Sequence, residues 1–190
     1  MSYFIEEFLI KKNINYFKNY LDFIESSIKE SEKQIKQEEE TINKLVAEKG
    51  EAIDDTEDYL VCLGEDHEQL KRTMYQSFVI SIFAFIEAKI INVQKRPNEF
   101  FANTEFQNEF DVAKGIRNIL LHEEGKISRK ERDQKKKEEK EKVRDFIERH
   151  PDFLEIDEFG GVIIKFEYVK SLIILTQDVC DKILKLTCET

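Results

Sequence analysis

The stretch 70-LKRTMYQSFVISIFAFIEAKIINVQKR-96 decides the fold of this chain of 190 residues. Apolar side chains recur in it every four residues, at Leu70, Met74, Phe78, Ile82 and Ile86. Val79, Phe83 and Ile90 lie beside this stripe, so most of the circumference is apolar, which indicates a helix at the centre of a bundle. Arg96-Pro97 ends it, because proline disfavours helical backbone at the preceding residue.

A second helical pattern occupies the N-terminal residues. Ten positions step by three and four, and eight of them are Ile, Phe or Leu: 14, 17, 21, 24, 28, 31, 35, 38, 42 and 45. Ser31 and Glu38 are the exceptions. We therefore predict one long helix with a heptad-like seam over residues 1–50, ending at Gly50. It is either a core helix whose far end projects into solvent or pairs with a neighbour, or an arm that binds a partner protein.

The C-terminal part adds helices and one hairpin. A helical stripe runs from Phe106 to Leu120 and stops at Gly125. Apolar residues alternate on both sides of Gly160-Gly161, at 154, 156, 162, 164 and 166, which predicts a short β-hairpin. An amphipathic helix follows over 169–183. The predicted fold class is all-α: a helical bundle of one domain, 1–190, with a long N-terminal helix and a short β-hairpin before the last helix.

The net charge of −10 disfavours general attraction to nucleic acid, yet one segment is basic. Residues 128–144 hold nine Lys or Arg against five Asp or Glu, and we interpret 128–150 as a charged, net basic insertion. It is either a solvated helix or loop whose Lys and Glu pair with each other, or a surface that captures RNA through Lys135, Lys136 and Lys137.

The hexad Arg117-Asn118-Ile119-Leu120-Leu121-His122 carries the candidate chemistry. On a helix Asn118 and His122 share a face, and Arg117 lies about 100° round from Asn118, within reach of the same cleft edge. A fixed cation and a titratable imidazole suit a phosphodiester, since one binds the anion and the other moves protons. A similar spacing from Arg144 to His150 lies in a highly charged segment, and we interpret it as a chance match.

These residues resemble the HEPN superfamily, whose pattern is an Arg, a polar residue and then a His four to six residues after the Arg, at the end of a bundle helix. Arg117-Asn118 to His122, followed by Gly125-Lys126-Ile127, is similar to the family signature. The stretch 75–88, YQSFVISIFAFIEA, is similar to its apolar helix with an embedded Glu, here Glu87. The resemblance covers about residues 55–190.

The resemblance implies a metal-independent endoribonuclease of the toxin or phage-defence kind, without a cofactor. It implies a homodimer in which two Arg-His pairs form one composite cleft that cuts RNA to 2′,3′-cyclic phosphates. His122 would carry protons, Arg117 would bind phosphate, and Asn118 would orient either. Glu87 would be a catalytic support or a structural salt bridge to Arg117. Glu123 and Glu124 place negative charge beside this site.

The alternative is a noncatalytic HEPN dimerisation or adaptor module, in which Arg117 and His122 make interface hydrogen bonds. Its long helix would dock an antitoxin or an ATPase subunit. In either case we expect a homodimer, because the apolar faces of the Phe78 and Leu120 helices exceed what one small bundle buries.

Other residues bound the setting. Three cysteines, Cys62, Cys180 and Cys188, have no metal-ligand spacing, and we predict reduced core thiols. His67 and His150 lie in charged surroundings and are predicted at the surface. The N-terminus lacks a secretion signal and the longest apolar run, 78–86, is too short for a bilayer, so we expect a soluble cytoplasmic protein with no membrane contact.

Overall fold

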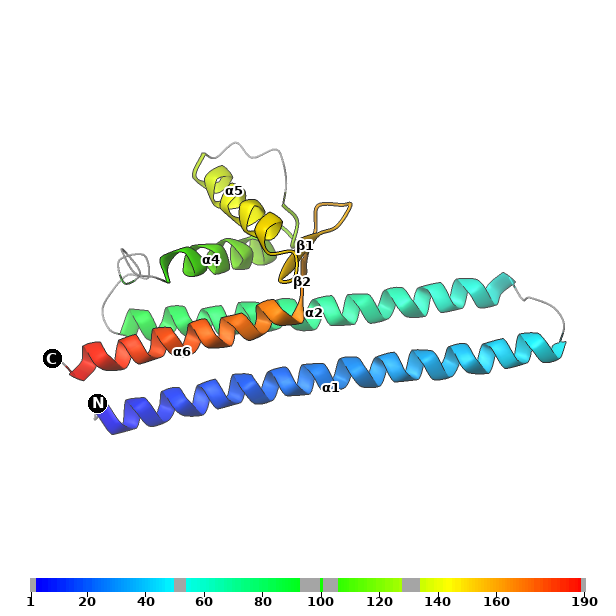
Figure 1. The fold of residues 1–190 in the computed structure, drawn as a ribbon, viewed down its shortest axis with the longest axis horizontal. Coiled ribbons are helices and arrows are strands. Elements are labelled where there is room, and N and C mark those ends of the chain that lie inside the picture. Colours follow the sequence, from blue (N-terminus) through cyan, green and yellow to red (C-terminus); the bar gives the residue numbers. More distant parts are fainter. Residues whose placement is uncertain (1–2, 50–53, 93–99, 101–105, 128–133, 189–190) are drawn as a thin grey trace. The chain divides into compact units, whose positions relative to one another are not determined.

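The computed structural model describes residues 3–49, 54–92, 100, 106–127 and 134–188 (Figure 1). Its elements, in order, are α1 Tyr3–Lys49, α2 Asp54–Asn92, α4 Gln107–His122, α5 Gln134–Arg149, β1 Leu154–Ile156, β2 Val162–Ile164 and α6 Phe166–Cys188. The predicted all-α class is confirmed, as are the long first helix and the hairpin before the last helix. Phe166, predicted in the second strand, instead begins α6.

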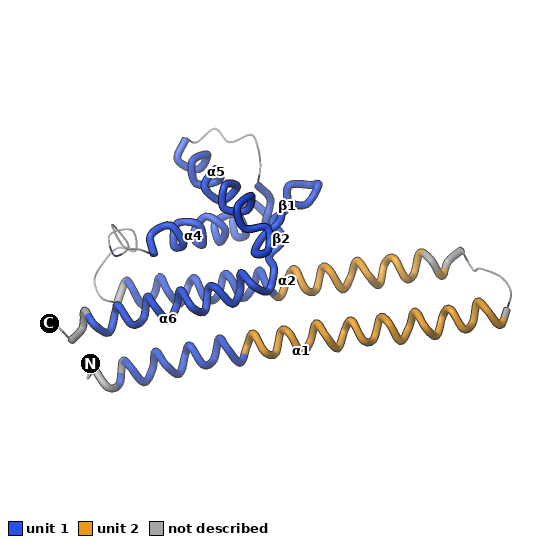
Figure 2. The backbone as a smooth tube through the Cα atoms, in the orientation of Figure 1, with its two compact units in different colours: residues 1–19, 75–190 blue, residues 20–74 orange. Residues whose placement is uncertain are grey.

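The chain divides into two compact units, which Figure 2 colours separately. Unit 1 comprises residues 1–19 and 75–190, and unit 2 comprises residues 20–74. Because α1 and α2 each contribute to both units, each unit takes one part of each long helix.

The core of unit 1 is built on α2, as its sequence predicts. Six of its residues are fully buried: Phe78, Val79, Ile82, Phe83, Ile86 and Ile90. The Phe83 ring stacks on Phe110 of α4 at 5.2 Å between centroids. Ile10 and Ile14 of α1 pack with Cys180 and Leu184 of α6. These contacts join four helices around one apolar centre.

The apolar surplus predicted for the Phe78 helix is absent from its part in unit 1. The Phe78 helix has no apolar surplus there, because its face is covered by the chain itself. Exposed apolar side chains of unit 1 lie instead on α1 at Ile5, Phe8 and Tyr16, on α4 at Leu121, on the hairpin at Ile156 and Phe159, and on α6 at Ile174.

Unit 2 consists of the remaining parts of α1 and α2, which run antiparallel. Tyr59 donates a hydrogen bond to Glu38 Oε2 at 2.7 Å, and His67 Nδ1 lies 2.9 Å from Ser31 Oγ. Along α2, Tyr59 precedes His67, whereas along α1 the partner of Tyr59, Glu38, follows the partner of His67, Ser31. This order is the one that antiparallel pairing requires. His67 is buried, so its predicted surface position is wrong: Ser31 on the facing helix hydrogen bonds to its Nδ1, and Glu32 Oε1 lies 3.8 Å from its Nε2.

The seam of α1 is confirmed for its first half and thins beyond it. Leu21, Ile24 and Ile28 are buried, whereas Glu38 and Leu45 are exposed. Cys62 is also exposed, so the predicted core thiol is wrong there, whereas Cys180 is buried as predicted. The side chain of Cys188 lies outside the described residues.

The hairpin joins the end of α4 to the rest of unit 1. Leu154 pairs with Ile164, and Ile156 pairs with Val162. The segment after α4 pairs with residues 160–162, at the start of β2. Val162 N–H donates to Gly125 O at 2.8 Å, and Ile127 N–H donates to Gly160 O at 2.7 Å. Gly125 has a φ of +76°, a conformation that suits glycine and turns the chain from α4 into this pairing. These hydrogen bonds tie the chain just after His122 to the hairpin.

The described part of the basic insertion is a helix packed on α4, which differs from a wholly solvated helix or a loop. At Gly115 of α4 a Cβ atom would lie 2.6 Å from Val143 Cγ2 of α5, so glycine permits the close approach. Val143, Ile147 and Lys140 form the buried face of α5. Residues 128–133 of the insertion lie outside the described residues.

One helical segment, Asp58–Ile90 of α2, is by length and composition apolar enough to cross a membrane. Its C-terminal part holds the fully buried side chains of the unit 1 core. Core helices of soluble proteins pass the same test.

Candidate functional site

The last turn of α4 places Asn118 and His122 on one face, as their spacing predicts. Both line a pocket of about 140 Å³ between α4 and α5. The rest of its lining comes from Gly115, Ile119, Glu123, Lys136, Glu139 and Lys140. The hexad and the basic insertion, which are separate in the sequence, therefore meet in one site.

Arg117 is held from three directions. Its Nη2 donates to Glu87 Oε2 of α2 at 2.5 Å, and its Nη1 donates to Asn118 Oδ1 at 2.9 Å. The guanidinium carbon lies 5.1 Å from the centroid of the Phe83 ring, a cation–π contact. Its side chain is 18% exposed and that of Glu87 is 26% exposed, so water screens this charge pair only in part. The predicted Glu87–Arg117 pairing is present.

The amide of Asn118 is fixed at both ends. Its oxygen accepts from Arg117, and its Nδ2 donates to Glu139 Oε1 of α5 at 2.9 Å. Four side chains from three helices thus form a continuous chain of hydrogen bonds, from Glu87 through Arg117 and Asn118 to Glu139. This chain holds Asn118 in one orientation at the pocket wall.

His122 is exposed, whereas Arg117 and Asn118 are partly buried. Within the described residues no side chain or backbone group hydrogen bonds to its ring. A solvent-accessible imidazole beside a pocket is available to exchange a proton with a bound molecule.

The negative charge that follows His122 is compensated locally. Glu123 Oε2 lies 2.5 Å from Lys140 Nζ, and Lys140 is only 5% exposed. Neither Lys140 nor Glu139 was singled out from the sequence. The signal was the spacing of Lys140, Val143 and Ile147, which steps by three and four along the buried face of α5.

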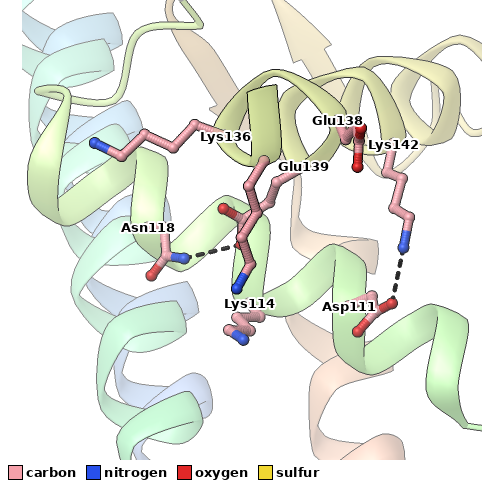
Figure 3. Close-up of a pocket in the computed structure, with 8 residues that line it drawn as sticks. Asp111, Lys114, Asn118, Lys136, Glu138, Glu139 and Lys142 are labelled. Atoms are coloured by element: carbon pink, nitrogen blue, oxygen red, sulfur yellow. Dashed lines mark hydrogen bonds and ion pairs between the residues drawn. The ribbon is translucent and has the colours of Figure 1, made fainter. Parts of the chain in front are cut away.

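A larger cleft of about 470 Å³ adjoins this pocket (Figure 3). It is lined by Asp111, Lys114, Asn118, Lys135, Lys136, Glu138, Glu139 and Lys142. Of the predicted RNA-binding lysines, Lys135 and Lys136 line it, whereas Lys137 lines neither pocket and pairs with Glu141 at 3.9 Å. Three consecutive helical residues point about 100° apart, so they cannot share one face.

The second Arg-His stretch lies in a different setting. Arg144 donates to the backbone oxygen of Ile127 at 3.3 Å. The His150 ring is exposed, as predicted, and stacks on Phe153 at 5.7 Å between centroids. Neither residue lines the two pockets described above.

Possible metal ligands do not gather in this site. In the part of the chain that the structure describes, no group of three or more His, Cys, Asp or Glu side chains is placed to hold a metal ion.

Comparison with known proteins gives no match to a family model, a curated protein or a solved structure. The resemblance to the HEPN superfamily therefore depends on the residues of the hexad, their place at the end of a bundle helix and the Glu of α2.

Proposed function

We propose that this protein is a metal-independent endoribonuclease of the HEPN type, acting as a homodimer. The observation that carries the proposal is the pocket in which exposed His122 lies beside Asn118, whose amide is fixed by Arg117. A proton carrier, an oriented amide and a cation one residue away can each contribute to cleavage of a phosphodiester.

The chemistry needs two proton carriers. His122 of one copy removes the proton of the ribose 2′-hydroxyl, and the 2′-oxygen attacks phosphorus. The bond from phosphorus to the 5′-oxygen breaks, and His122 of the second copy donates a proton to that oxygen. The products are a 2′,3′-cyclic phosphate and a 5′-hydroxyl. One copy supplies a single exposed His in its site, which is why the proposal includes a dimer.

The charges around the pocket are compatible with a bound phosphate. Lys140 compensates Glu123, and Arg117 is paired with Glu87. Lys136 lines the same pocket as His122 and adds a cation from α5. For such a dimer we propose a cytoplasmic location, where RNA is available, and an antitoxin or ATPase subunit as its regulator.

A second function is favoured by one observation. Two nitrogens of Arg117 already donate to Glu87 and Asn118, and its face lies against Phe83. An Arg engaged in this way stabilises the contact between α2 and α4 and serves a noncatalytic HEPN dimerisation or adaptor module equally well. The two functions differ in whether Arg117 can also contact a phosphate.

The test is incubation of the purified protein with total RNA in EDTA, with the His122→Ala variant as control. The ribonuclease is expected to give fragments with 5′-hydroxyl ends and 3′ ends that resist phosphatase until acid opens the cyclic phosphate. Light scattering of the same samples should give the mass of a dimer. If RNA stays intact with the wild type, or if both proteins cleave it equally, the ribonuclease proposal fails and the adaptor function remains.

A further inference from the structure

We propose that the cleft between α4 and α5 binds the phosphate backbone of single-stranded RNA through Lys114, Lys135 and Lys136 and guides it to His122. This inference rests on the proposed ribonuclease function and names the cations that hold its substrate. Lys114 belongs to α4 and lies outside the basic insertion in the sequence. In the structure it lies in the middle of the cleft (Figure 3).

The lining of the cleft is cationic in an acidic protein. Its eight residues include four Lys and three carboxylates, whereas the whole chain carries −10. Each carboxylate has a polar side-chain partner: Asp111 with Lys142, Glu138 with Gln134 and Glu139 with Asn118. These contacts spread the negative charge onto neighbouring groups and lower the repulsion that a phosphate would meet.

The cleft leads to the proposed reactive group. Asn118, Lys136 and Glu139 line both the large cleft and the smaller pocket that contains His122. In Figure 3 Lys136 and Asn118 lie at one end of the cleft, and the Lys142–Asp111 pair lies at the other. A strand bound along the cleft therefore reaches the His122 pocket at the Asn118 end.

The length of the cleft fits a short run of nucleotides. Asp111 and Asn118 are seven residues apart on α4, which at a rise of 1.5 Å per residue is about 10 Å. Phosphates in one nucleic-acid strand are spaced by about 3.4 Å along the axis of a duplex. Phosphates of an extended single strand lie farther apart than this axial rise, so the cleft holds no more than about three of them, as many as its lysines other than Lys142.

The lining also indicates what is recognised. None of the described residues that line the cleft is aromatic, so they offer no platform for stacking of bases. Lysine ammonium groups bind phosphates as point charges without reading the base. We therefore infer contact with the backbone and little preference for sequence within the cleft itself.

The test compares two variants that each remove positive charge. In a His122→Ala background, which prevents cleavage, the Lys114→Gln/Lys136→Gln pair alters the cleft, and Lys137→Gln alters a neighbouring lysine outside it. Anisotropy of a labelled single-stranded RNA of about twelve nucleotides is measured across a series of salt concentrations. The single change Lys136→Gln, at an exposed residue, serves if circular dichroism shows that the pair impairs folding.

We expect the cleft pair to lose at least about tenfold in affinity and to flatten log K against log salt by about 1.4, which is about 0.7 for each lost contact. Lys137→Gln should change affinity by less than about twofold. Equal losses for the two variants, or no RNA binding by the parent protein, would overturn the cleft assignment. If the parent binds RNA through the cleft lysines but wild type cuts none, the cleft stands and the ribonuclease proposal fails. If wild type cuts RNA and the cleft variant binds RNA as well as the parent does, the ribonuclease proposal stands and the cleft assignment fails.

Discussion

The two Arg-His stretches of this chain have similar spacing and different surroundings. Arg117 bonds to two side chains, Glu87 and Asn118, and His122 is exposed beside a pocket. Arg144 bonds to a backbone oxygen, and the His150 ring stacks on Phe153 and contacts Phe146. The first stretch ends a helix at a cleft, and the second ends a helix at an aromatic contact.

This difference shows that spacing alone does not define the candidate site. An Arg that donates to a backbone carbonyl connects α5 to the segment after α4, and this one lines neither of the two pockets described above. An Arg connected to an oriented amide at a pocket wall can contribute to binding an anion. Substitutions in the two stretches should therefore differ in effect. Those at Arg117 and His122 should change the reaction rate, and those at Arg144 and His150 should change stability alone.

The first comparison concerns catalysis at the two arginines. Arg117→Ala should lower the single-turnover cleavage rate by about 10²- to 10³-fold, as expected when one stabiliser of developing charge is removed. Arg144→Ala should retain the wild-type rate. Both rates are measured on one RNA, with circular dichroism to show that helicity is kept. A variant at Arg117 that stays folded and fully active would contradict the assigned role.

A smaller effect is expected at the ion pair that follows His122. Lys140→Met should lower the free energy of unfolding by about 1–3 kcal/mol, because Glu123 loses its partner in a partly buried position. Lys142→Met, which breaks the more exposed pair with Asp111, should cost less than about 1 kcal/mol. Urea unfolding measures both. Equal costs would show that Lys140 does not compensate Glu123 in the way described.

The smallest effect concerns the contact between α4 and α5, which carry the two stretches. Gly115→Ala should lower the free energy of unfolding by about 1–2 kcal/mol, because the new methyl group meets the buried Val143 side chain. Gly64→Ala in α2 is the matched control, since no atom lies within 4 Å of its added Cβ. It should raise stability by up to about 1 kcal/mol through helix propensity. Thermal unfolding that ranks the two variants in the opposite order would argue against this packing.

Periodic features of the fold could be predicted from the sequence. The stripe through Phe78, Ile82 and Ile86 matches the helical period and is fully buried, and Gly160-Gly161 lies between the two strands of the hairpin. In both cases the information is local, because a helix or a hairpin brings together residues close in sequence.

Features that depend on distant partners could not be predicted in this way. The burial of His67 depends on Ser31, 36 residues earlier, and that of Lys140 depends on Glu123 and on the absence of a side chain at Gly115. Composition around each residue is charged, which predicts exposure. The site shows the same division, since the shared face of Asn118 and His122 follows from helical spacing, but the contribution of Glu139 requires that α5 pack on α4.

The most direct test of the ribonuclease is a comparison of the two histidines on one RNA substrate in EDTA. His122→Ala should lower the single-turnover rate by about 10²- to 10⁴-fold, the usual contribution of a general acid or base. His150→Ala should stay within about twofold of wild type, as expected for a surface residue away from the site. Equal rates for wild type and both variants would contradict the proposal that the pocket of Asn118 and His122 cuts RNA.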